Sequence, residues 1–84
     1  MNKYDQYIWD VESYLRTRYG IDATDRMIDP LVWYIRTGRA SATFLINLLA
    51  VKPYCIGKIL AKGGSHDEVI QKIRKRIGLP AVTW

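Results

Sequence analysis

Lysine, arginine and tyrosine are the side chains whose placement in this 84-residue sequence indicates a chemistry, the binding of phosphate. Between Asp29 and Asp67 the sequence has no acidic residue, although that stretch carries three lysines and two arginines. A surface with charge of one sign repels itself and is typical of a site that meets a partner of opposite charge. The stretch therefore predicts contact with a polyanion, and double-stranded DNA is the first candidate.

The residues that we expect to contact DNA are cations and one phenol. Lysine can neutralise a phosphate or donate to guanine, and the phenol can pack on a sugar or donate to a phosphate. The expected contacts are Arg39, Lys52, Tyr54, Lys58 and Lys62, with Lys72, Lys75 and Arg76 as accessories. The accessory cluster has two interpretations: a solvated helix face, or a second contact to the DNA backbone. Gly57 is expected to face outward and to let the DNA backbone approach closely.

Charge is distributed unevenly along the chain. Residues 1–29 hold four basic and six acidic residues, a net charge of −2, whereas residues 30–84 hold nine basic and two acidic residues, a net charge of +7. This asymmetry indicates an N-terminal structural part and a C-terminal binding part of one domain, residues 1–84. An apolar content of 49% is too high for a disordered chain. No apolar stretch approaches membrane length, and the single Cys55 fits a cytoplasmic protein.

Apolar residues at helical spacing predict an all-α bundle of about five helices. The expected helices are residues 3–19, a helix that ends at Thr37, residues 42–49, residues 53–62, and one that begins at Ser65 and ends before Gly78. Ser41 is the expected cap of the third helix, and Pro53 suits the first position of the fourth. Ser65 and Glu68 have the spacing of a capping box.

The second helix is harder to place, because Pro30 interrupts it. Asp22, Thr24 and Asp25 are candidate N-caps. An interior proline removes a hydrogen bond and pushes the preceding residue out of the helical region. Two solutions are open: a kinked helix, or a one-turn piece followed by a helix that Asp29 caps. We favour the second.

Residues 42–62 match the spacing of a helix-turn-helix, in which the second helix lies in the major groove of DNA. With Ala42 as the first of twenty positions, the five positions expected to be apolar are all apolar. They are Leu45, Leu49, Val51, Ile56 and Ile59. Ala50 stands where glycine is usual, and Ile46 stands at a buried position where a small residue is usual. The alternative is an ordinary helical hairpin with similar spacing.

The segment from Thr37 to Leu45 resembles a known DNA-binding family. Arg39-Ala40-Ser41-Ala42-Thr43 is similar to the segment ahead of the first motif helix in the gamma domain of FtsK-type DNA translocases, a winged helix that reads short oriented DNA motifs. The resemblance covers about residues 24–62 and implies a helix-turn-helix scaffold. Tyr54 and Cys55 differ from the family's residues at base-reading positions, and a capped helix stands where the wing would lie. The resemblance therefore implies neither a particular DNA motif nor a translocase role.

No arrangement of residues predicts catalysis. His66 is the only histidine, and the order Ser65-His66-Asp67 is consecutive, whereas a catalytic triad needs groups that converge from different elements. Cys55 has no expected histidine partner, and Gly63-Gly64 lacks the strand that precedes a phosphate-binding loop. A metal site would need a second cluster of ligands. We therefore expect a protein that is not an enzyme and uses no metal or cofactor.

Two functions from different classes fit these features. The first is a DNA-binding transcription regulator or architectural factor, such as those of phages and plasmids, with helix 53–62 in the major groove. Because one short helix reads few base pairs, a homodimer is expected, and helix 3–19 with an outward Trp9 is the candidate dimer surface. The second is an inhibitor or adaptor whose basic face meets an acidic protein surface, anchored by Trp9, Trp33 or Trp84. Binding of structured RNA is a third, weaker option.

Overall fold

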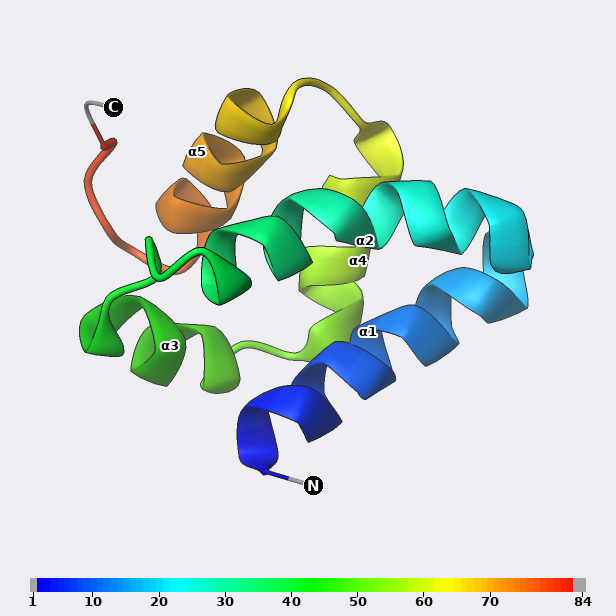
Figure 1. The fold of residues 1–84 in the computed structure, drawn as a ribbon, viewed down its shortest axis with the longest axis horizontal. Helices are drawn as coiled ribbons and strands as arrows, with labels where there is room; N and C mark the ends of the chain where they lie inside the picture. Colours follow the sequence, from blue (N-terminus) through cyan, green and yellow to red (C-terminus); the bar gives the residue numbers. More distant parts are fainter. Residues whose placement is uncertain (1, 83–84) are drawn as a thin grey trace.

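Five helices form the regular structure of the protein in a computed structural model that describes residues 2–82. They are α1 (Lys3–Tyr19), α2 (Ile21–Arg36), α3 (Ala42–Leu49), α4 (Pro53–Lys62) and α5 (His66–Arg76). Figure 1 shows α1 and α2 running in opposite directions, and α4 contacts both of them as well as α5. No strand occurs in the described range, so the expected all-α bundle is confirmed.

All five helices contribute to one hydrophobic core. The buried side chains recur at helical spacing, and burying each stabilises the fold by about 1.5–3 kcal/mol. They are Tyr7, Val11 and Leu15 from α1, Ile28, Leu31 and Tyr34 from α2, Phe44 and Leu48 from α3, Ile56 and Leu60 from α4, and Val69, Ile70 and Ile73 from α5. Ile77, just after α5, completes the expected buried stripe of that helix.

Side-chain caps begin α3 and α5 where the sequence predicts them. Ser41 Oγ accepts a hydrogen bond from the backbone N–H of Phe44 at 3.1 Å. Ser65 Oγ accepts from the backbone N–H of Glu68 at 3.2 Å and donates to the Glu68 carboxylate at 3.0 Å. These bonds satisfy N–H groups that the first turn of a helix leaves without a partner, which fixes where each helix starts.

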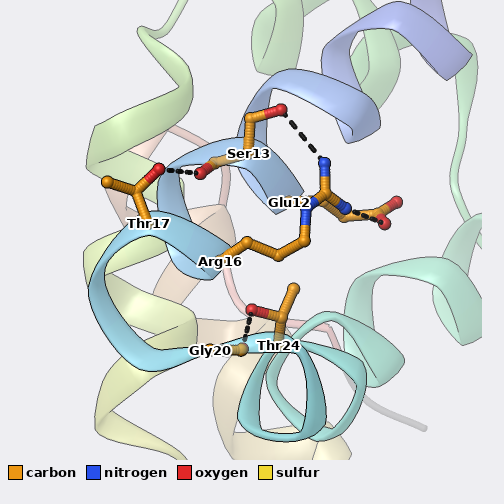
Figure 2. Close-up of polar contacts among 6 residues, drawn as sticks. All are labelled: Glu12, Ser13, Arg16, Thr17, Gly20 and Thr24. Atoms are coloured by element: carbon orange, nitrogen blue, oxygen red, sulfur yellow. Dashed lines mark hydrogen bonds and ion pairs between the residues drawn. The ribbon is translucent and has the colours of Figure 1, made fainter.

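Gly20 alone separates α1 from α2. Its φ of 85° lies in the left-handed region that favours glycine, so the chain reverses without a longer loop. Asp22, Thr24 and Asp25 lie inside α2, and the prediction that they cap it is wrong. Thr24 is instead buried, and its hydroxyl donates to the Gly20 carbonyl at 2.7 Å (Figure 2).

The α2 helix continues through Pro30, so the preferred break at Asp29 is also wrong. An interior proline costs about 3 kcal/mol relative to alanine. Against that cost, α2 buries Ile28, Leu31 and Tyr34 from the turns around the proline, and the proline ring is itself buried. Burial at several positions outweighs one weakened turn, and tertiary packing therefore overrides the local preference.

The α3 and α4 helices form a sharp corner. The turn between them spans Ala50 to Lys52, and the two axes are bent by 109° at the break. Tyr7 of α1 holds this turn, because its buried hydroxyl donates to the Val51 carbonyl at 2.8 Å. The chain thus changes direction sharply between α3 and α4 within three residues.

Candidate nucleic-acid interface

One exposed row of side chains runs along α4. Tyr54, Lys58 and Lys62 are four residues apart, which places them on the same helix face. All three are exposed, and the Lys58 ammonium lies 5.3 Å from the centre of the Tyr54 ring. Lys52, also exposed, comes immediately before the helix. We call Tyr54, Lys58 and Lys62 the α4 row.

Gly57 is not on this face. It is buried against α1, and a Cβ placed on it would lie 2.5 Å from Cδ1 of Tyr14. The expectation that Gly57 lets DNA approach is therefore wrong: glycine is required here so that α4 can pack closely on the Tyr14 ring. Cys55 and Ala61, also on α4, are half-buried.

The residues of α3 that are buried differ from those that the helix-turn-helix spacing predicted. Phe44 and Leu48 are the fully buried residues of α3, whereas Leu45 and Leu49 are only half-buried. Ile46, expected at a buried position, is 63% exposed. The Phe44 ring packs edge-on against Tyr34 at 4.9 Å between centroids, and this contact with α2 decides which face of α3 turns inward.

A basic groove lies between α4 and α5. It has a volume of about 540 Å³, and its lining residues are Ile59, Lys62, Lys72, Lys75 and Arg76. Every charged member of this set is basic, and the cations come from both helices. The structure thus brings the predicted accessory cluster of α5 to the same surface as Lys62 of the α4 row. Ile59, predicted only as a core residue, is half-buried and lines the groove.

The cations of the basic groove have no ionic partner within the described residues. Arg16 forms an ion pair with Glu12 there, and His66 Nε2 lies 3.1 Å from Asp29 Oδ2. Attraction to the negative C-terminal end of a helix accounts for a cation in the last turn, as at Lys62, but not for one in the middle, as at Lys72. An apolar wall beside unpaired cations strengthens their field, which favours binding of an anion.

Arg76, which lines the groove, also joins α5 to α4. Arg76 Nη2 of α5 lies 3.4 Å from Cys55 Sγ of α4. Tyr7 lies nearby on the core side. Burial raises the pKa of the Tyr7 hydroxyl well above its ordinary value, and the Cys55 thiol adds to this effect while the Arg76 cation opposes it.

Arg39 is the predicted contact that the structure sets apart from the groove. Its guanidinium lies over the Trp33 ring of α2, 4.8 Å from the centroid. The Trp33 ring also lies near His66, with 5.1 Å between the two ring centroids. His66 Nε2 lies 3.1 Å from a carboxylate oxygen of Asp29. These contacts join the α2–α3 loop and the start of α5 to α2.

Trp9 lies on the outer face of α1 and is 50% exposed. The Arg16 guanidinium lies over its ring at 4.6 Å, and Figure 2 shows the same guanidinium bonded to Glu12 and Ser13. Trp9 therefore has neighbouring side chains to lie against, and it also exposes apolar surface. Trp84, the third tryptophan considered as an anchor, lies outside the described residues.

Between residues 2 and 82, no group of three or more His, Cys, Asp or Glu side chains could hold a metal ion. No single helix described there is long and apolar enough to cross a membrane; α3 and α4 pass that test only when joined across their 109° bend. A second hollow of about 270 Å³ has Arg26 among a mainly apolar lining that includes Met27, Pro30 and Leu60.

Comparison with known proteins gave no match: no family model fits the chain, and neither a curated protein nor a solved structure is significantly similar to it. The function must therefore be argued from the helix corner and the basic groove themselves.

Proposed function

We propose that the protein binds double-stranded DNA through the α4 row and the basic groove. The observation that carries this proposal is the groove itself, where Lys62, Lys72 and Lys75 from two helices converge without an acidic partner. A phosphate backbone is the common polyanion that such a surface fits. The α3–α4 corner supports duplex DNA in particular, since a helix held at this angle can enter the major groove.

In this arrangement α4 and α5 contact different parts of the DNA. The α4 row faces the major groove, with Lys52 at the start of the helix next to the backbone. Lys72, Lys75 and Arg76 of α5 contact flanking phosphates and take the place that a wing has in winged-helix proteins. The biological role that we propose is that of a small transcription regulator or architectural factor.

Titration of a labelled duplex at several salt concentrations tests the proposal. Lys58→Ala removes one cation from the α4 row, and the slope of log affinity against log salt should become shallower by about one. Lys3→Ala is the matched control, because it removes the same charge from α1, outside the groove, and should leave the slope unchanged. If no duplex binds at low salt, the proposal fails.

A dimer is a further part of the proposal. The outer face of α1 exposes Trp9, and large aromatic residues are enriched where proteins associate. Two copies would place two α4 helices on one duplex and lengthen the site that is bound. The competing proposal, an acidic protein surface as partner, predicts saturable binding of that protein with no affinity for duplex DNA.

A further inference from the structure

Reading a DNA sequence favours particular side chains, and α4 carries only one of these types, lysine. Arginine or lysine pairs with guanine and asparagine or glutamine with adenine in the major groove, and carboxylates accept from cytosine. The ten residues of α4, PYCIGKILAK, contain no arginine, asparagine, glutamine or carboxylate. The α4 row therefore offers lysine ammonium groups and a phenol, which bond to phosphate and base alike.

Two α5 side chains that could form paired hydrogen bonds to a base are already hydrogen-bonded within the protein. The Gln71 amide donates to the Val82 carbonyl at 2.7 Å and accepts from the Val82 N–H at 3.0 Å. Arg74 donates through Nε to the Pro80 carbonyl at 2.8 Å and through Nη1 to the Tyr34 hydroxyl at 3.3 Å. Both bond to the segment 80–82 that follows α5, and neither lines the groove.

Arg76 is the one guanidinium left in the groove. It follows Lys72 by one helical turn and lies at the last position of α5. One of its terminal nitrogens is already directed at Cys55 Sγ. This contact restricts the guanidinium from forming two parallel hydrogen bonds to a guanine. Its remaining N–H groups can still donate to a phosphate oxygen.

The other groove cations are lysines, whose flexible stems carry a compact charge with no fixed bonding plane. Such groups neutralise a phosphate backbone, and they discriminate between base pairs less than the planar fork of arginine does. The half-buried Ile59 adds an apolar wall that strengthens the field of Lys62, Lys72 and Lys75.

We infer that the protein binds duplex DNA without reading its sequence, as an architectural or coating protein does. This inference rests on the proposed DNA binding. Of the two roles proposed, it favours the architectural factor over the transcription regulator. Five cations of the α4 row and the groove, Lys58, Lys62, Lys72, Lys75 and Arg76, contribute up to about −4.5 to the salt slope at 0.9 per neutralised phosphate, and Lys52 adds to it. Affinities for unrelated duplexes of equal length should then differ by less than about tenfold, where sequence-specific proteins reach a thousandfold or more.

Competition and selection test the inference together. Unlabelled duplexes that are AT-rich, GC-rich or mixed should displace a labelled duplex at similar concentrations. Selection from a randomised duplex pool should enrich no motif. Tyr54→Ala and Lys58→Ala should weaken binding by the same factor for every duplex, and Lys3→Ala should leave all of them unchanged.

The contrary outcomes are distinct. An enriched motif that binds at least a hundredfold more tightly than its scrambled version overturns sequence-independent binding and leaves the proposed DNA binding intact. A loss of affinity on Tyr54→Ala that is confined to one duplex sequence overturns the inference in the same way. Absence of binding to any duplex at low salt overturns the proposed function itself.

Discussion

Gly57 shows how one residue can decide the position of a helix. A Cβ there would lie 2.5 Å from the Tyr14 ring, closer than side-chain contacts allow. Although alanine usually favours a helix over glycine, Gly57→Ala should lower the free energy of unfolding by about 1–3 kcal/mol because it overpacks the α1–α4 contact. Urea denaturation followed by circular dichroism measures the change.

The control for this prediction removes the other partner. In a Tyr14→Ala background the space beside Gly57 is open, and the same Gly57→Ala change should be neutral or stabilising. A loss of stability of equal size in both backgrounds would contradict the close contact with Tyr14.

Sequence reasoning identified the exposed residues of α4 but placed Gly57 on the wrong side. Lys58 and Lys62 carry charges that mark a solvated face, and the structure exposes both. Glycine has no side chain to indicate a face, so its role is visible only once Tyr14 of a distant helix is seen beside it.

At the scale of elements, Tyr7 joins α1 to the α3–α4 turn through its bond to the Val51 carbonyl. Because burial raises the pKa of this hydroxyl, the folded protein keeps the proton when the unfolded chain loses it. The contribution is complete below about pH 10, the ordinary pKa of tyrosine, and is lost as pH rises above that value.

Tyr7→Phe tests this linkage. The variant should be less stable by about 1 kcal/mol at pH 7, because it lacks the hydrogen bond. Between about pH 9 and about pH 11, a range that brackets the ordinary tyrosine pKa of about 10, the free energy of unfolding of the variant should fall less than that of the wild type. Denaturant unfolding at each pH measures both free energies. Parallel losses in the two proteins would contradict the role given to the buried hydroxyl.

The start of α5 gives a second prediction at this scale. Ser65→Ala removes the acceptor for the Glu68 N–H and should lower the free energy of unfolding by about 1 kcal/mol. Ser65→Asp retains a capping oxygen and should stay close to the wild type. Thermal unfolding compares the three proteins, and equal stability of all three would show that the cap contributes nothing.

The bounds of α3, α4 and α5 were predictable because Ser41, Pro53 and Ser65 mark their starts by local chemistry. The course of α2 was not predictable in this way. Pro30 argues locally for a break, and only the burial of its neighbours in a core built from all five helices reverses that argument.

For the whole molecule, the basic groove is the feature that the sequence could not predict in full. Both basic clusters are visible in the sequence, but their convergence depends on α4 and α5 packing with Arg76 beside Cys55. The same packing separates Arg39, which lies over Trp33 instead. Tertiary contacts between distant segments thus bring Lys62 together with the basic cluster of α5 and leave Arg39 outside the groove.

The proposed dimer is tested at this scale by Trp9→Ala. Sedimentation should show a dimer for the wild type and a monomer for the variant, because the change removes the exposed aromatic surface of α1. Lys3→Ala, on the same helix, should remain a dimer. A dimeric Trp9→Ala protein would exclude this face as the interface.

In the proposed function, cations from α4 and α5 bind one duplex together. Its most direct test is the salt dependence of duplex binding by the wild type and by a Lys62→Ala/Lys75→Ala double variant, which removes one groove cation from each helix. We expect the double variant to bind more weakly at every salt concentration, with a slope that is shallower by about two. An unchanged slope, or a wild type that binds no duplex at low salt, would contradict it.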